Sequence, residues 1–115
     1  CEPFVTTEQG GGFVRNGKIK NIFAINSRKK TKNDEADKLL NFIWENFNML
    51  PFALRWITKE WEEKEAKNLL DILVKKKAVQ AYPVLIEVNE QRVAQAEHTF
   101  IPIDNGVTVT TKALR

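Results

Sequence analysis

The sequence has little cysteine and histidine and no long apolar run. Each of the two residues occurs once in the 115-residue chain. A single cysteine cannot form an internal disulfide, which fits a reducing compartment. The apolar stretches are far shorter than the roughly 20 residues that cross a bilayer, and no signal-peptide pattern opens the chain. We therefore expect a soluble, cytoplasmic protein with no membrane partner. Because the first residue is Cys1 and not methionine, we also expect a fragment or a processed product.

A large charge excess is also missing. The 18 basic and 15 acidic residues give a formal net charge of +3, which is too small to require a nucleic-acid partner, so the distribution of charge matters more. Two basic clusters stand out, Arg28-Lys29-Lys30 with Lys32, and Lys75-Lys76-Lys77. The second fits a solvated helix end, where cations complement the helix dipole. A phosphate-binding surface is the alternative interpretation.

The length and a hydrophobic content of 43% fit one compact domain with a single core. Its first 27 residues have the pattern of strands and turns. Gly10-Gly11-Gly12 predicts a loop, and its spacing does not match a nucleotide-binding glycine motif. Asn16-Gly17 predicts a hairpin turn, and Ile22 to Ile25 predicts a short buried strand.

From Thr31 to about Val79 the pattern is helical. Apolar residues at three- and four-residue spacings predict a first helix, and they are Ala36, Leu39, Leu40, Ile43, Trp44 and Phe47. Pro51 predicts the first turn of a second, shorter helix. A third helix is expected from Thr58 or Trp61 to Lys76, because glutamates fill its first turns and lysines its last. Its inward positions are Ala66, Leu69, Leu70, Leu73 and Val74.

After the third helix the apolar period returns to two. Tyr82 to Val88 and Arg92 to Ile103 predict antiparallel strands joined at Asn89-Glu90, and Asp104-Asn105-Gly106 predicts a turn into a last strand. Three helices followed by a hairpin is the order of a winged-helix module, which often binds DNA through its third helix. The outward glutamates of that helix would repel phosphates, so we do not expect it to enter a DNA groove.

The segment Gln95-Ala96-Glu97-His98-Thr99 places the only histidine beside a carboxylate. Both side chains titrate, bind metals and move protons. A second carboxylate, Glu2, also has apolar neighbours, and two such acids suggest paired ligands for a hard metal. Adjacent side chains on a strand face opposite sides, so we expect His98 to be a structural, hydrogen-bonded residue and not to share a metal with Glu97. Glu2 as an exposed terminal residue and Glu97 as a paired strand carboxylate remain alternatives.

Six segments follow one another in a familiar order through almost the whole chain. They are Cys1-Glu2-Pro3-Phe4, Leu39 to Phe47, Leu50 to Trp56, Ala81 to Leu85, Val93 to Thr99 and Val107 to Thr111. Together they resemble the type II methionine aminopeptidases, particularly the archaeal ones. The resemblance implies an α+β fold, the C-terminal part of a pita-bread aminopeptidase. Residues 1–30 and 91–115 would supply strands of the catalytic fold, and residues 31–90 an inserted three-helix, winged-helix-like subdomain.

In this family two aspartates, one histidine and two glutamates hold two metal ions. By resemblance, Glu2 and Glu97 are the two glutamates, and Gln95 and His98 support them. Glu2 is also the candidate catalytic residue, since it would shuttle a proton to the leaving amine. The implied cofactors are two divalent ions, cobalt, manganese, iron or zinc. The aspartates and the ligand histidine lie upstream of the Glu-Pro-Phe motif, outside this chain.

The resemblance also implies substrate contacts. Tyr82 and Leu85 match positions that line the pocket for the methionine side chain, and Pro51 and Phe52 lie in a stretch that borders it. An apolar pocket with few polar groups suits a thioether. Packing within the domain is an equal alternative for Tyr82. The pocket histidine of some relatives has no counterpart after the Glu-Pro-Phe strand here.

The expected function is that of the C-terminal portion of a metallo-aminopeptidase that removes the initiator methionine from nascent proteins. Its expected partners are the N-terminal portion of the same enzyme, as a separate chain or in a longer parent, the nascent peptide, and the nearby ribosome. Without the three upstream ligands the chain alone should be catalytically incomplete. The alternative is a non-enzymatic relative that binds protein or RNA through its basic clusters.

Overall fold

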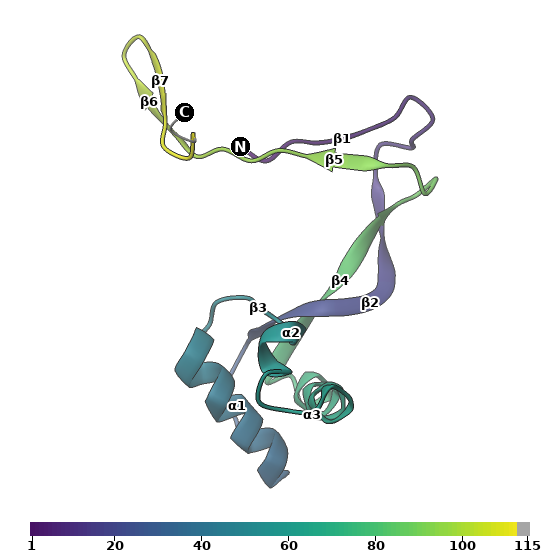
Figure 1. Cartoon of the computed structure of the whole chain (residues 1–115), viewed down its shortest axis with the longest axis vertical. Coiled ribbons are helices and arrows are strands. Elements are labelled where there is room, and N and C mark those ends of the chain that lie inside the picture. Colours follow the sequence, from purple (N-terminus) through teal and green to yellow (C-terminus); the bar gives the residue numbers. More distant parts are fainter. Residues whose placement is uncertain (113–115) are drawn as a thin grey trace. The chain divides into compact units, whose positions relative to one another are not determined.

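The computed structural model describes residues 1–112 as an α+β fold with helices and antiparallel strands (Figure 1). The chain forms two compact units, which we describe in turn: unit 1 contains residues 1–15 and the segment from Leu85 onward, and unit 2 contains Asn16–Val84. The helices are α1 (Asp34–Phe47), α2 (Leu54–Ile57) and α3 (Glu63–Lys75). The strands are β1 (Phe4–Thr6), β2 (Val14–Ile25), β3 (Phe52–Ala53), β4 (Val79–Glu87), β5 (Val93–Gln95), β6 (Phe100–Ile103) and β7 (Gly106–Val109). Within residues 1–112, no helix is long and apolar enough to span a membrane.

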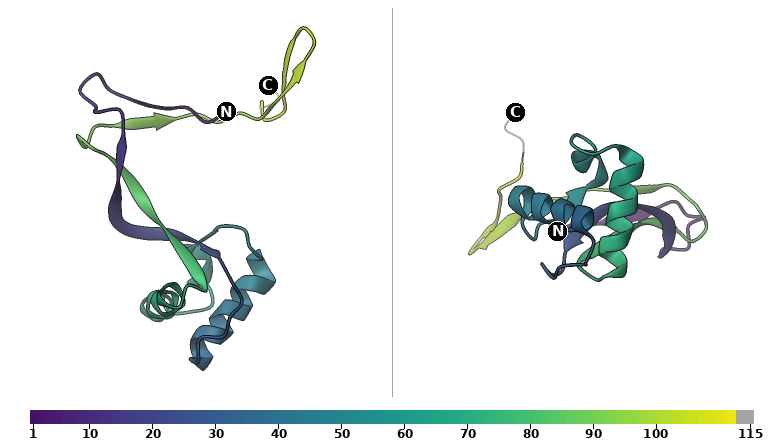
Figure 2. Two further views of the ribbon diagram at one scale, coloured as in Figure 1. Left: turned by 180° about the vertical axis from the view of Figure 1, so that it is seen from behind. Right: turned by 90° about the horizontal axis from the view of Figure 1, so that it is seen from below.

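The first predicted helix is confirmed as α1. The Asn33 side chain caps it by accepting a hydrogen bond of 2.9 Å from the Ala36 N–H, which satisfies one of the free donors in the first turn. Its buried residues are Ala36, Leu39, Leu40 and Ile43, which follow the predicted spacing. This face packs against α3 (Figure 2), whose buried residues Ala66, Leu69, Leu70 and Leu73 were also predicted. The core of unit 2 therefore follows from helical periodicity.

The second helix begins later than predicted. Pro51 precedes a two-residue strand, β3, and α2 starts only at Leu54. The strand forms because Phe52 and Ala53 pair antiparallel with Phe23 and Ile22 of β2. The Phe52 ring stacks on Phe23 with ring centroids 5.9 Å apart, and such contacts outweigh the local preference of the proline for a helix start.

The predicted hairpin turn at Asn16-Gly17 is wrong. Both residues lie inside β2, which continues without interruption to Ile25. Neither residue has the positive φ that a type I′ turn requires. Instead β2 is the middle strand of a sheet with the order β3-β2-β4, so non-local pairing on both sides replaces the local turn. The prediction of a buried strand at its end is confirmed for Phe23, Ala24 and Ile25, which are all buried.

Unit 1 contains two antiparallel two-stranded ribbons. One pairs β1 with β5 and the other pairs β6 with β7. The second confirms the predicted turn at Asp104-Asn105-Gly106, where Gly106 has a φ of +148°. The predicted hairpin of Tyr82 to Val88 with Arg92 to Ile103 is wrong, because β5 pairs with β1 and β4 with β2. The two strands that flank the turn at Asn89-Glu90 therefore do not pair with each other, and each pairs with a different strand.

Glu87 joins the glycine loop to this turn within unit 1. Its side chain is buried and accepts hydrogen bonds from the N–H groups of Gly11, Asn89 and Gln91, at 2.5, 2.8 and 3.1 Å. A Cβ on Gly11 would come within 2.4 Å of the Val88 side chain, so the loop needs glycine to approach this closely. Burial alone would raise the pKa of Glu87, but the N–H groups of Gln91, Gly11 and Asn89 hold the pKa below its usual value.

We expect Glu87 to make stability depend on pH. Because the folded-state pKa is lowered, the carboxylate stabilises the fold above 4.5, the value of an unshifted glutamate, and this stabilisation is lost as the pH falls through the folded-state pKa. Denaturant titrations below that pH should show a shallower fall in the free energy of unfolding for Glu87→Gln than for the unmodified chain. Equal slopes for the two proteins would contradict this role. High salt should preserve the difference, since the donors are backbone groups and not distant charges.

Candidate functional site

The ribbon of β1 and β5 brings the two predicted carboxylates together. Its register pairs Phe4 with Gln95 and Val5 with Ala94. Backbone hydrogen bonds continue this register beyond the strands, from the Ala96 N–H to the Pro3 carbonyl at 3.3 Å and between Cys1 and His98 in both directions, at 2.9 and 3.0 Å. Glu2 therefore lies directly opposite Glu97. Since the pairs on either side carry the hydrogen bonds, this is a non-hydrogen-bonded pair, in which the side chains come closest and share one face.

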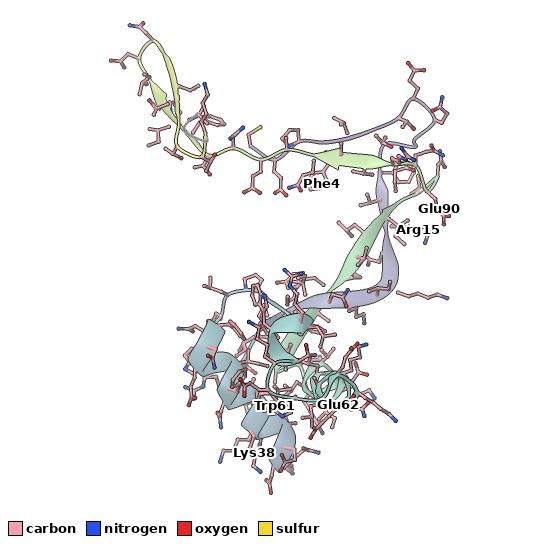
Figure 3. The ribbon with its side chains drawn as sticks, in the orientation of Figure 1. Phe4, Arg15, Lys38, Trp61, Glu62 and Glu90 are labelled. Carbon is pink, nitrogen blue, oxygen red and sulfur yellow. The ribbon has the colours of Figure 1, made fainter. Side chains whose placement is uncertain are left out.

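Gln95 fixes one side of the pair. Its Nε2 donates to Oε1 of Glu2 across the ribbon, as the diagonal neighbours of an antiparallel pair can do. Phe4 projects from the same face as Glu2, because side chains two apart on a strand lie on one side, and it is 63% exposed (Figure 3). Our sequence interpretation did not include Phe4 in the site, although strand alternation from Glu2 would have indicated it. The face thus offers two carboxylates, an amide and an aromatic ring.

His98 lies on the opposite face of the ribbon from Glu97, by the same alternation. Its Nδ1 is 3.0 Å from Oγ1 of Thr111, which also accepts a hydrogen bond of 2.9 Å from the Thr99 N–H. Thr111 was absent from the predicted site. It could have been found from the turn at Asp104-Asn105-Gly106, because continuing the register of β6 and β7 from that turn places Thr111 opposite His98.

The predicted substrate-contact residues are distributed over both units. Tyr82 and Leu85 lie on β4, and their side chains are 40% and 60% exposed. Pro51 is exposed in the loop before β3. Phe52 is 1% exposed, and its ring centroid lies 5.5 Å from that of Phe47 and 5.9 Å from that of Phe23. Phe52 therefore belongs to the core of unit 2 as the structure stands, and the substrate roles of all four residues stay predictions.

The paired carboxylates have the chemistry of a partial site for a hard divalent ion. Carboxylate oxygens are ligands that such ions accept, but six or so oxygen ligands are typical of a complete site. Among residues 1–112, no group of three or more His, Cys, Asp or Glu side chains is arranged to hold a metal. The donors fit one side of a metal centre, and the remaining ligands would have to come from elsewhere.

No family model matches the chain, but solved and curated proteins do. The solved structure of a thermophilic Arx1 superposes with a TM-score of 0.76 at 21% identity, over 95% of this chain and 28% of that one. At this identity the likeness shows the fold alone, an α+β part of a pita-bread-related architecture.

Curated relatives are more similar in sequence. The methionine aminopeptidase of Methanocaldococcus jannaschii is 39% identical over 96% of this chain and 36% of its own length. The enzymes of Saccharolobus solfataricus and Thermococcus kodakarensis are 40% and 39% identical, over 98% and 96% of this chain and 38% and 37% of theirs. The chain is a homologue of the archaeal-type methionine aminopeptidases and spans about a third of their length.

Proposed function

We propose that this chain is the C-terminal portion of a metal-dependent methionine aminopeptidase, in which Glu2 and Glu97 hold one side of a site for two divalent ions. The single observation that supports this most is the register of the β1–β5 ribbon, which sets the two carboxylates opposite each other although they are 95 positions apart in the sequence. Two aspartates and one histidine from an N-terminal portion, in the same parent or a separate chain, would complete the site.

The residues of this chain would have different roles in metal binding and catalysis. Bound divalent ions would supply Lewis acidity and lower the pKa of a water molecule. Glu2 would accept the proton of that water and pass it to the leaving amine, and Gln95, which donates to Oε1 of Glu2, would keep its carboxylate oriented. Glu97 would bridge the ions, and His98, held by Thr111 on the other face, would support the strand. Leu85, Tyr82, Pro51 and Phe52 remain the proposed contacts of the methionine side chain.

The substrate would be the N-terminal methionine of a nascent protein, so we propose a cytoplasmic setting near the ribosome. We further propose that residues 1–30 and 91–115 belong to the catalytic fold and residues 31–90 to a winged-helix-like insertion. The β3-β2-β4 sheet with three packed helices supports the insertion, because a winged helix combines these elements.

Reconstitution tests the proposal. The chain is combined with the N-terminal portion of an archaeal homologue, cobalt or manganese is added, and hydrolysis of a Met-Ala peptide is followed. We expect turnover from the combination and none from either part alone. If Glu97→Ala left the turnover of the active combination unchanged, the ligand assignment would be wrong. If the combination itself showed no turnover, a non-enzymatic role would be favoured.

A further inference from the structure

The two basic clusters of unit 2 adjoin each other in the structure although they are far apart in the sequence. The N–H groups of Asn26 and Ser27 both donate to the carbonyl of Ala78, at 2.9 and 3.1 Å. Arg28 directly follows one side of this contact, and Lys77 directly precedes the other. All seven cations are exposed, namely Arg28, Lys29, Lys30, Lys32, Lys75, Lys76 and Lys77. We call them the joined basic surface.

The first half of this surface is an ordered segment. The Arg28 guanidinium lies 4.6 Å from the centre of the Trp44 ring, a cation–π distance. Thr31 is buried, and both its N–H and its hydroxyl donate to Oδ1 of Asp37 at 2.8 Å. These contacts hold the segment against α1, while Arg28, Lys29, Lys30 and Lys32 all remain exposed. Among residues 1–112 none of the seven cations forms an ion pair with a carboxylate.

Each half of the surface contains a lysine in a backbone conformation that favours glycine. Lys32 has a φ of +68° and Lys77 a φ of +58°. Lys77 ends α3 in a Schellman motif, since the Ala78 N–H bonds to the Leu73 carbonyl at 3.0 Å and the Lys77 N–H to the Val74 carbonyl at 2.9 Å. Glycine is the usual residue at that position. Lysine therefore occupies two places where glycine would stabilise the fold, and a charge gained at the expense of stability indicates a binding role.

Charge is also unevenly divided between the units. Unit 2 contains 14 basic and 9 acidic residues, a net charge of +5, whereas the rest of the chain contains 4 and 6, a net charge of −2. Along α3 the acids Glu63 and Glu65 occupy the first turn and Lys75 the last. An anionic partner would therefore approach the C-terminal end of α3, opposite to the end that a DNA-recognition helix uses.

We propose that the joined basic surface binds the phosphodiester backbone of a nucleic acid. Seven cations on two converging segments match an array of phosphates, whose binding releases counterions. A membrane surface fits less well, because neither Ser27–Lys32 nor Lys75–Lys77 contains an exposed large apolar side chain that could enter a bilayer. This binding is independent of the proposed aminopeptidase activity.

The test replaces the two strained lysines in the natural full-length protein. Binding of an RNA hairpin and of a matched DNA duplex is measured by fluorescence anisotropy at several salt concentrations. For Lys32→Gly with Lys77→Gly we expect about tenfold weaker binding at low salt, and a slope of log K against log salt that is smaller by about 0.7–0.9 for each lysine lost. The unfolding temperature should stay level or rise by about 1–3 °C, because glycine relieves the backbone strain. The tighter of the two ligands identifies the source of the phosphates.

Matched variants make the result decisive. Lys59→Gln with Lys64→Gln removes the same charge outside the surface and should change affinity less than about twofold. Lys29→Gln with Lys30→Gln, and Lys75→Gln with Lys76→Gln, should each weaken binding if one ligand spans both halves. The proposal is overturned if the control pair weakens binding as much, if only one half matters, if no binding occurs at low salt, or if vesicles containing phosphatidylserine bind more tightly than either nucleic acid.

Discussion

Replacing Glu2 by glutamine is expected to lower the kcat of the proposed assembled aminopeptidase by about 10²–10⁴-fold, the usual contribution of a general acid or base. Glutamine keeps the size of the side chain and can still pair with Gln95, but it cannot accept and return a proton. The KM for a Met-Ala peptide should change little, because the substitution acts on the transition state. Steady-state kinetics at saturating metal would measure both constants.

Replacing Glu97 by glutamine should have a different signature. If Glu97 is a bridging ligand, its loss weakens metal affinity, so part of the lost turnover should return when the metal concentration is raised. Glu8→Gln is the matched control, since Glu8 is an exposed glutamate in the loop after β1, and it should leave kcat within about twofold. The paired site would be contradicted if the Glu2→Gln variant kept full turnover. It would also be contradicted if the Glu97→Gln variant lost no turnover at limiting metal concentration.

Replacing Phe52 by alanine is expected to lower the free energy of unfolding by about 3–5 kcal/mol, the range for deleting a buried aromatic side chain. Phe52 is 1% exposed and its ring stacks with those of Phe23 and Phe47, so alanine leaves a cavity in the core of unit 2. Urea titration of the chain measures the effect. Phe13→Ala is the control, because the side chain of Phe13 is 66% exposed and should contribute less than about 0.5 kcal/mol.

A second substitution at this position separates packing from substrate contact. Phe52→Leu keeps most of the apolar volume and should cost less than about 1.5 kcal/mol. If Phe52 also bordered the methionine pocket, this variant would raise KM in the assembled enzyme while the unfolding midpoint moved little. An unchanged KM would leave Phe52 with a core role alone.

Local periodicity predicted the parts of the fold that depend on neighbouring residues. The apolar spacing from Ala36 to Ile43 identified the buried face of α1, and Asp104-Asn105-Gly106 identified the β6–β7 turn. The larger errors concern pairing between distant segments, whereas the third helix only begins later than predicted, at Glu63 and not at Thr58 or Trp61. Asn16-Gly17 has the local preference of a turn, but strands on both sides of β2 hold it extended, and no short-range signal reports such partners.

In the candidate site, too, the sequence predicted some features and could not predict others. Glu2 and Glu97 were singled out by their residue types and by the family resemblance, whereas their direct opposition depends on a register that spans most of the chain. The contact between the two basic clusters was also not predictable, because it rests on two hydrogen bonds to the Ala78 carbonyl. The positive φ values at Lys32 and Lys77 could not be predicted from the sequence, because lysine rarely adopts such a backbone conformation.

The long separation between β1 and β5 has a kinetic consequence. To form their ribbon from an unfolded chain, Phe4 and Gln95 must close a loop of about ninety residues, which is slow because the entropy is lost before the contacts form. β2 and β4 are neighbours in one sheet, so prior folding of unit 2 would shorten this loop to the two arms outside it and save about 1 kcal/mol of closure entropy. We therefore expect unit 2 to fold first and the carboxylate pair to assemble last.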